Sequence, residues 1–227
     1  MTEPAPNPTH TRLKQAAQTL GLALDDAAAT QLLAYLAMLQ RWNRVYNLTA
    51  VRDPQEMLTH HVLDCLAVLP PLRRHAAGRS LRVLDVGSGG GLPGVAIAIM
   101  QPEWPVCTID AVAKKASFVR QVAAEVPVRN LRALHGRVEV LEPAPAEGGQ
   151  GYDLIVSRAF ASLADFVALT RHLLTPGGAW LAMKGRAPDD EVAALPADVT
   201  VFHVEQLRVP DLAAQRCLVW LRPHGRT

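Results

Sequence analysis

Five glycines fall within the eight positions from Gly87 to Gly94, directly after a short apolar run at residues 81–86. A buried parallel strand that ends in a glycine turn and leads into a helix has this pattern. Glycine lets the backbone turn sharply and lets a ligand approach closely, because no Cβ is in the way. In an open α/β sheet, nucleotide-like cofactors bind at the turn after the first strand. The stretch therefore predicts a cofactor site.

Two cofactors fit this pattern. Residues 89–94 match the dinucleotide motif GxGxxG, and Asp110 lies 19 residues past Gly91, at the end of the expected second strand. That is roughly the spacing at which a carboxylate accepts hydrogen bonds from an adenosine ribose. Because NAD and S-adenosylmethionine both carry an adenosine, the spacing supports the two about equally.

Three further features favour S-adenosylmethionine. Asp85 stands just before the glycines, where we expect it to face a cationic or amino group, whereas a pyrophosphate would be repelled there. The turn begins two residues later with Gly87-Ser88-Gly89, which is typical of methyltransferase loops. A turn at residues 175–178, a strand and a terminal hairpin also suit a methyltransferase sheet, in which the last strand is antiparallel.

From residue 81 onward, strand and helix patterns alternate, which predicts a mostly parallel sheet. Strands are expected at residues 81–86, 106–110, 131–135, 152–157, 179–184, 199–207 and 216–221. Helices are expected at residues 93–100, 113–126, 162–174 and 189–194. The last two strands are joined by too few residues for a crossover helix, so we expect an antiparallel hairpin. Residues 143–151, rich in proline and glycine, are expected to form a surface loop. The fold class is thus α/β, with a Rossmann-like domain over residues 81–227.

Residues 1–80 are expected to form a helical N-terminal extension. Residues 12–20 and a longer stretch that begins at Asp25 have helical spacing, and a third helix is expected to begin at Asp53. This third helix carries His60, His61 and Asp64 within about one turn. We favour one paired and one solvated histidine over a metal site, because no further ligand is visible.

The composition excludes several classes of protein. No apolar run of the 227 residues approaches the roughly 20 that a membrane span requires. The three cysteines are widely separated, with no CxxC, which disfavours a disulfide framework or zinc site and favours a cytoplasmic protein. The net charge of +2 does not indicate a nucleic-acid binder, so any phosphate-binding surface must be a local cluster. A non-enzymatic RNA-binding module would have no use for the cofactor loop.

Several segments together resemble a known bacterial family. They are WNRVYNLT at residues 42–49, HVLD at 61–64, DVGSGGGLPG at 85–94, KK at 114–115, RVE at 137–139, SRAF at 157–160 and MKG at 183–185. In this order they resemble the 16S ribosomal RNA guanine-N7 methyltransferase G family, also called glucose-inhibited division protein B. The resemblance extends from about residue 33 to residue 221.

The resemblance implies transfer of a methyl group from S-adenosylmethionine to N7 of one guanine in 16S ribosomal RNA, free or in the small subunit. By motif it implies these cofactor-binding residues: Gly87, Leu92, Val138, Glu139 and Arg158. The glycine loop and the ribose spacing add Gly89 and Asp110. An oxidoreductase that uses NAD, or a methyltransferase with another acceptor, are the alternatives.

The expected sheet also gathers positive charge. Four basic residues follow the carboxyl ends of successive strands: Arg137, Arg158, Lys184 and Arg186. We therefore expect them to lie at the edge of the sheet where the cofactor binds. We predict that Arg137, Lys184 and Arg186 bind RNA phosphates. Lys114 and Lys115 begin a helix, where cations oppose the helix dipole, which favours a functional role for one of them.

The chemistry at N7 needs no general base, because neutral guanine already has an in-plane lone pair there. We therefore expect no catalytic dyad, no metal ion and no single catalytic residue that the sequence can identify. N7 is inaccessible in an A-form helix, so the target should be unpaired or splayed out and stacked on an aromatic ring. Tyr46 and Phe160 are the candidates for that ring. The protein is expected to be a monomer.

Overall fold

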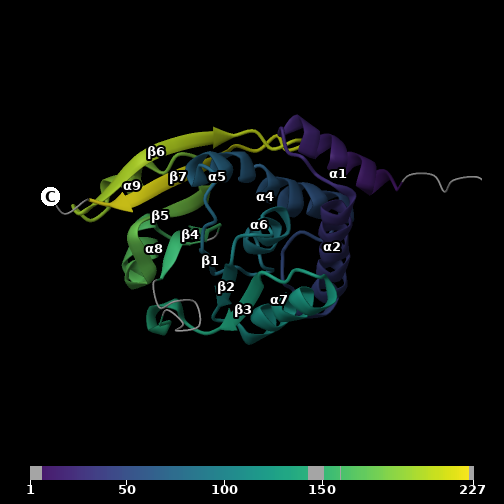
Figure 1. Ribbon diagram of the computed structural model, residues 1–227, viewed down its shortest axis with the longest axis horizontal. Coiled ribbons are helices and arrows are strands. Elements are labelled where there is room, and N and C mark those ends of the chain that lie inside the picture. Colours follow the sequence, from purple (N-terminus) through teal and green to yellow (C-terminus); the bar gives the residue numbers. More distant parts are fainter. Residues whose placement is uncertain (1–6, 143–150, 159, 225–227) are drawn as a thin grey trace, which may run out of the picture.

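A seven-stranded sheet forms the centre of the computed structural model, which describes residues 7–142, 151–158 and 160–224 (Figure 1). The strand order is β3-β2-β1-β4-β5-β7-β6. The strands are β1 (Val83–Val86), β2 (Val106–Asp110), β3 (Leu131–His135), β4 (Tyr152–Ser157), β5 (Leu174–Lys184), β6 (Val199–Leu207) and β7 (Arg216–Pro223).

Strands β1 to β5 pair in parallel, and β7 is antiparallel to both β5 and β6. The predicted Rossmann-like sheet and its terminal hairpin are therefore confirmed. The chain starts in the middle of the sheet at β1, adds β2 and β3 on one side, and then crosses to β4 and β5 on the other. The strand order thus reverses between β1 and β4, and open α/β sheets bind ligands at the carboxyl ends of such strands.

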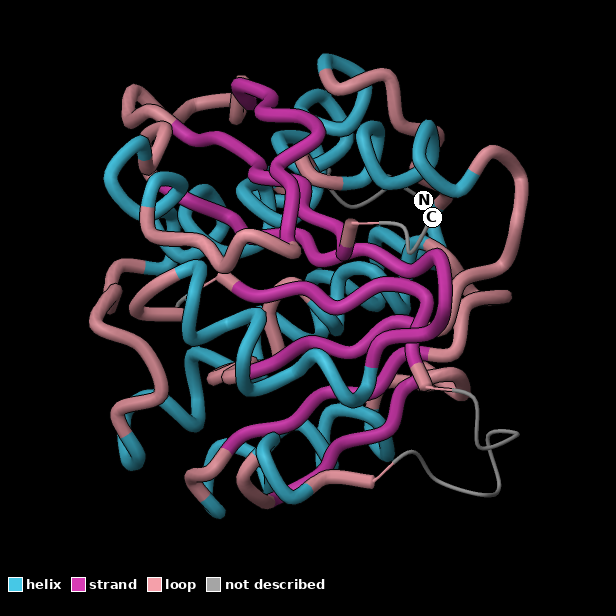
Figure 2. The backbone as a smooth tube through the Cα atoms, turned by 90° about the vertical axis from the view of Figure 1, so that its left-hand side faces the viewer, coloured by secondary structure: helices cyan, strands magenta, loops and turns pink. Residues whose placement is uncertain are grey.

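Helices cover both faces of the sheet, and Figure 2 shows the strands running between them. They are α1 (Pro8–Thr19), α2 (Asp26–Tyr46), α3 (Pro54–Met57), the π-helix η1 (Leu58–Leu63), α4 (Asp64–Leu66), α5 (Leu69–Ala76), α6 (Gly94–Met100), α7 (Ala113–Glu125), the 3-10 turns η2 (Val138–Val140) and η4 (Arg171–Leu173), α8 (Leu163–Thr170) and α9 (Asp189–Ala193). Among the described helices, none is long and apolar enough to cross a membrane.

Alternation along the strands divides the apolar side chains between two cores. Val83 and Leu154 belong to the core that contains α6 and α7, whereas their chain neighbours Leu84 and Ile155 belong to the core under α8. This is the period of two that a strand buried on both faces requires. The helices of the extension pack into the first core, so the extension and the sheet share one apolar interior.

Capping residues fix where the helices of the extension begin and end. Asp25 accepts a hydrogen bond from the backbone N–H of Ala28, and Asp53 accepts from those of Gln55 and Glu56. Gly21 follows α1 with φ at +67°, a left-handed conformation that glycine adopts without strain. The sequence predicted a helix that begins at Asp53 and a stretch of helical spacing that begins at Asp25, and the structure has both.

Two elements differ from the expectation. The helix from Asp53 does not stay α-helical, because residues 58–63 widen into the π-helix η1. Strand β5 begins at Leu174 rather than after a turn at 175–178, and its pairing with β4 is irregular between Tyr152 and Leu154. The extended strand accommodates Gly177 at a φ of +80°. Residues 143–150 of the expected surface loop lie outside the described residues.

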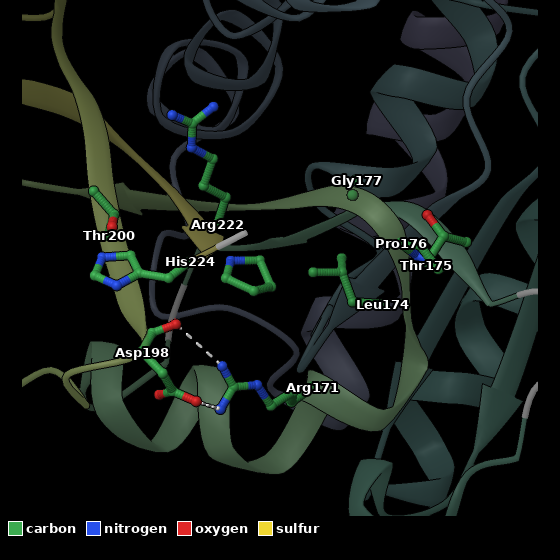
Figure 3. Close-up of a pocket in the computed structure, with 11 residues that line it drawn as sticks. Arg171, Leu174, Thr175, Pro176, Gly177, Asp198, Thr200, Arg222 and His224 are labelled. Carbon is green, nitrogen blue, oxygen red and sulfur yellow. Dashed lines mark hydrogen bonds and ion pairs between the residues drawn. The ribbon is translucent and has the colours of Figure 1, made fainter. Parts of the chain in front are cut away.

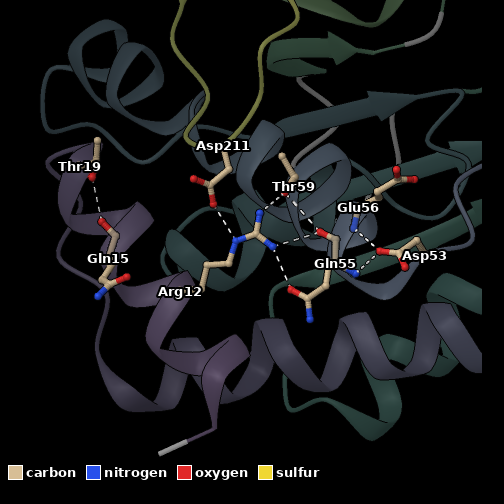
Figure 4. Close-up of polar contacts among 8 residues, drawn as sticks. All are labelled: Arg12, Gln15, Thr19, Asp53, Gln55, Glu56, Thr59 and Asp211. Carbon is tan, nitrogen blue, oxygen red and sulfur yellow. Dashed lines mark hydrogen bonds and ion pairs between the residues drawn. The ribbon is translucent and has the colours of Figure 1, made fainter.

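Arg12 ties α1 to two distant parts of the chain (Figure 4). Its Nε donates to Asp211, in the turn between β6 and β7, at 2.7 Å. Its terminal nitrogens donate to Oε1 of Gln55 at 3.0 Å and to Oγ1 of Thr59 at 2.6 Å. Since Thr59 belongs to η1, this network anchors the π-helix against α1 and the hairpin.

Candidate functional site

The glycine turn after β1 has an open side and a packed side. Gly87 and Gly89 have φ values of +65° and +58°, and a Cβ at either position would meet no atom within 4 Å. At Gly91, with φ at +87°, a Cβ would lie 2.6 Å from Val95 and 2.9 Å from Val119. Gly91 therefore lets the loop pack on α6 and α7, while the other two glycines border space that a ligand can enter.

Asp110 holds this loop in place from the end of β2. Its Oδ2 accepts a hydrogen bond from the backbone N–H of Gly89 at 2.9 Å, and its Oδ1 accepts from Val112 at 2.8 Å. The sequence predicted a ribose acceptor here and missed this role as a support of the loop. Each carboxylate oxygen can accept a second hydrogen bond, so the two roles are compatible.

Asp85 lies behind the loop rather than facing a ligand, which contradicts the sequence interpretation. The side chain is fully buried, and its Oδ2 accepts a hydrogen bond from the backbone N–H of Gly94 at 2.7 Å. No partner within the described chain binds Oδ1. Burial raises the pKa of this carboxyl to about 7, although the Gly94 hydrogen bond opposes the shift.

A cavity of about 180 Å³, the first cavity, opens beside the glycine turn. It is lined by Leu39, Leu48, Thr49, His61, Gly87, Ser88, Gly89, Gly90, Leu92, Lys115 and Arg158. Three of the predicted cofactor residues besides Gly87 are thus brought together, namely Gly89, Leu92 and Arg158. The extension supplies the opposite wall, so the site forms between the extension and the sheet.

A second cavity, of about 330 Å³, adjoins the first, because His61 and Arg158 line both. Its remaining lining is Val51, His60, Asp64, Met183, Lys184, Gly185 and Arg216. The extension contributes three of these seven residues, and the other four lie at the end of β5, directly after it, and at the start of β7.

Asp64 is the buried centre of an ion triad beside the second cavity. Its side chain is 3% exposed, and its two oxygens lie 2.9 Å from Nε of Arg216 and 3.4 Å from Nη1 of Arg158. Nη1 of Arg158 also donates to the carbonyl of His60 at 3.1 Å. The triad fixes Arg158 where both cavities meet.

His61 is a neutral group in this site. Its Nε2 lies 2.9 Å from Oγ1 of Thr49, and its Nδ1 is buried without a partner among the described residues. Burial, together with the positive charge of Arg158, lowers the pKa of His61 to about 4. The π-helix η1 positions this side chain, and π turns are frequent at functional sites. Within the ranges that the structure describes, no three His, Cys, Asp or Glu side chains are grouped to hold a metal.

A sequence model of the family described as rRNA small subunit methyltransferase G matches residues 28–219. The chain belongs to this family. Ribosomal RNA small subunit methyltransferase G of Acidovorax sp. (strain JS42) is 58% identical over 219 residues, which cover 93% of this chain and 94% of that one. The protein of that name from Leptothrix cholodnii is 57% identical, over 96% of this chain and 97% of that one.

Solved methyltransferase structures have the same fold as this member of the methyltransferase G family. The glycopeptide N-methyltransferase MtfA in complex with sinefungin gives a TM-score of 0.58 at 13% identity, over 73% of this chain and 88% of that one. TrmN from Thermus thermophilus gives 0.53 at 22% identity, over 73% of this chain and 53% of that one. These similarities concern the fold alone.

Three of the predicted cofactor residues, Asp110, Val138 and Glu139, are not among the residues that line the first cavity. Val138 and Glu139 begin the 3-10 turn after β3, and the N–H of Gly136 donates to the carbonyl of Asp110 at 3.1 Å. The end of β3 is therefore next to the carboxylate that supports the glycine turn. Glu139 accepts hydrogen bonds from Arg137, and together with the backbone this lowers its pKa.

The predicted RNA-binding residues differ in exposure and in whether their charges are already paired within the protein. Lys184 is 15% exposed and forms an ion pair with Glu191 at 2.8 Å. Arg137 is 77% exposed, yet it pairs with Glu139 at 2.7 Å. Arg186 is exposed, with no hydrogen bond or ion pair to any other described residue. Of the three, Arg186 has its charge most available for a phosphate.

Sequence reasoning missed two members of the second cavity, Val51 and Arg216. Arg216 begins β7 and reaches Asp64 from 152 positions away in the chain. No local motif marks it, because its place depends on β7 returning beside β5. Thr49, Asp64 and Lys115 lie in segments that carried the family resemblance, and the unfavourable place of Lys115 at a helix start was a second signal.

A more voluminous cavity lies elsewhere (Figure 3). It measures about 1340 Å³ and is lined by the amino end of β5 and by residues around the ends of β6 and β7, including Arg171, Asp198 and Arg222. Arg171 and Asp198 form an ion pair at 2.6 Å there. Since the glycine turn follows the carboxyl end of β1, this cavity is at the opposite edge of the parallel sheet.

Proposed function

We propose that this protein transfers a methyl group from S-adenosylmethionine to N7 of a guanine in 16S ribosomal RNA. Membership of the methyltransferase G family over most of the chain carries this proposal. The open side of the glycine turn supports it, because Gly87 and Gly89 leave space where a cofactor can contact the backbone. Nothing found supports the alternative of an oxidoreductase that uses NAD.

The cofactor would be held at the carboxyl edge of the sheet. Gly87, Gly89, Leu92 and Arg158 line the first cavity, and Asp110, Val138 and Glu139 stand beside it. The bound cofactor supplies a methyl group on a positively charged sulfur. The two oxygens of Asp110 keep capacity for ribose hydroxyls, and the residues after β3 would lie against the adenine.

The charges around the cavity suit a reaction in which positive charge moves from sulfur to the purine. His61 is neutral at physiological pH, because its pKa is about 4. Asp64 offsets the charge of Arg158. With no proton to remove before attack, the protein contributes alignment of N7 with the methyl group and an electrostatic environment that tolerates the new cation.

Arg137, Lys184 and Arg186 would contact RNA phosphates, with Arg186 the least engaged within the protein. Such contacts position the RNA and carry no sequence information. We further propose a monomer that acts in the cytoplasm on ribosomal RNA or the small subunit. Tyr46, which is 41% exposed and packs against Trp42 with the two rings tilted, is available to a base, whereas the half-buried Phe160 packs on Phe166.

Methyl transfer to isolated small-subunit RNA tests the proposal. With methyl-labelled S-adenosylmethionine, the purified protein should label that RNA, and nuclease mapping should place the label on N7 of one guanine. Absence of label on every RNA and subunit preparation would refute it. Calorimetric titration with S-adenosylhomocysteine and with NAD separates a methyltransferase from an oxidoreductase, since only one ligand should bind at micromolar concentration.

Gly87→Ala tests where the cofactor sits. A Cβ there would project into open space at a φ of +65°, so we expect weaker binding of S-adenosylhomocysteine in a protein that still folds. Gly78→Ala is the matched control, because Gly78 also has positive φ and open space but lies before β1, outside the cavity linings. Equal affinity in both variants would place the cofactor elsewhere.

A further inference from the structure

The second cavity has the position and size of a site for the acceptor. It meets the first cavity at His61 and Arg158, so a group within it would be next to anything bound at the glycine turn. Its volume of about 330 Å³ is near the lower end of the ~300–1,000 Å³ typical of ligand pockets, which suits a single base. Val51 from the extension and Met183 from β5 provide apolar surface for a planar ring.

The lining of the second cavity is rich in hydrogen-bond donors. Arg158, Arg216 and Lys184 all line it, and Asp64 is occupied by the two arginines. The edge of guanine that carries N7 also carries O6, and both are acceptors, whereas adenine has an amino donor in place of O6. Donors around this cavity therefore favour guanine over adenine.

His61 supplies an unpaired donor at the junction of the two cavities. The N–H of Val51 donates to Oγ1 of Thr49 at 3.2 Å, which leaves the hydroxyl hydrogen of Thr49 free to donate to Nε2 of His61. In the tautomer in which Nε2 accepts from this hydroxyl, Nδ1 carries the proton. This N–H is buried without a partner in the described chain, a situation that a folded protein rarely leaves uncompensated.

We propose that the second cavity binds the base of an unpaired guanosine and that Nδ1–H of His61 donates to its O6. This proposal rests on the proposed function. In the transfer, the N7 lone pair forms the bond to the methyl carbon while the carbon–sulfur bond breaks. The electron pair of that bond stays on sulfur, which becomes a neutral thioether, and the purine takes the positive charge. A donor on O6 orients N7 while leaving its lone pair free.

The neutral state of His61 agrees with this role. Burial and the charge of Arg158 lower the pKa of His61 to about 4, so the imidazole does not add a positive charge next to the sulfonium or the methylated purine. His61 is a binding residue for the acceptor here and removes no proton.

The test replaces His61 and measures RNA and cofactor separately. For His61→Leu we expect kcat/KM for small-subunit RNA to fall about 10- to 100-fold, the effect of one lost hydrogen bond to a buried group. Affinity for S-adenosylhomocysteine should stay within about threefold of the parent protein. His61→Asn should recover most of the activity, because its amide can donate close to the position of Nδ1. His203→Leu, an exposed histidine on β6, is the matched control.

The possible outcomes distinguish the proposed role of His61 from the proposed function of the protein. If the parent protein labels RNA and His61→Leu keeps the parent kcat/KM, the proposal is wrong while the proposed function stands. Loss of S-adenosylhomocysteine binding in His61→Leu would assign the residue to the cofactor and overturn the proposal. If the parent labels no RNA, the proposed function itself fails. Should His61→Leu not fold, Val51→Trp decides, because Val51 lines only the second cavity and a filled cavity should lower kcat/KM for RNA alone.

Discussion

Asp85→Asn should remove a loss of stability that the parent protein undergoes as the pH rises from 5 to 8. The Asp85 carboxyl is fully buried, with a pKa raised by burial to about 7, against an ordinary value of 3.8. A carboxyl with a raised folded pKa contributes stability that is fully present below 3.8 and is lost as the pH rises through 7. Asparagine has the same shape, does not titrate, and keeps an oxygen to accept from Gly94.

The size of the effect follows from the two pKa values. Between them, the unfolding free energy falls by about 1.4 kcal/mol for each pH unit. From pH 5 to pH 8 the parent protein should lose about 2–3 kcal/mol relative to Asp85→Asn. Since 1 kcal/mol shifts the Tm of a chain of this size by roughly 2–4 °C, the gap in Tm should widen by about 5–10 °C.

Thermal unfolding followed by circular dichroism at pH 5 and pH 8 measures this gap. All other titrating groups are common to the two proteins, so their contributions cancel. Asp153→Asn is the control, because hydrogen bonds from Arg82 outweigh burial and lower the pKa of Asp153, which keeps it ionised throughout this range. A Tm gap for Asp85→Asn that is the same at both pH values would refute the burial argument.

Four further substitutions test the structure and the contact with RNA. Gly94→Ala should lower the unfolding free energy by about 1–3 kcal/mol in urea titration, because its Cβ would lie 2.7 Å from Thr108. A Cβ at Gly89 would enter open space, so Gly89→Ala should lower the unfolding free energy by only about 1 kcal/mol. Equal losses of unfolding free energy in the two variants would contradict the close packing around Gly94. Asp64→Asn should cost about 3 kcal/mol, since it leaves two guanidinium groups without their counterion; a loss under about 1 kcal/mol would mean that water screens them. Arg186→Ala should raise KM for RNA without changing S-adenosylhomocysteine affinity, and an unchanged KM would show that it contacts solvent only.

The sequence predicts the parts of the fold that depend on local chemistry. The glycine turn, the caps at Asp25 and Asp53 and the buried strands all follow from residue types at short spacing. The antiparallel return of β7 also follows, because the connection from β6 is too short for a crossover helix. The division at residue 80 remains a prediction, although the two parts share one core.

The site is predicted less completely, because it depends on contacts between distant segments. Asp85 and Asp110 were expected to contact a ligand from their place beside the glycines, yet both bind backbone N–H groups that fix the loop. Which carboxylate oxygens remain free depends on how the loop folds back, and spacing does not contain that information. Arg216 joins the site only because the hairpin returns it to Asp64.

The π-helix η1 also sets which of its own side chains face the cavities. A π turn advances by less than the roughly 100° per residue of an α-helix, so η1 takes in one more residue over nearly the same rotation. Deleting one residue there would let the turn close into α-helix geometry, and the helix on either side would keep nearly the same phase. Such a deletion should therefore change which side chains of η1 face the cavities, His61 among them, while α3 keeps its contact with Arg12.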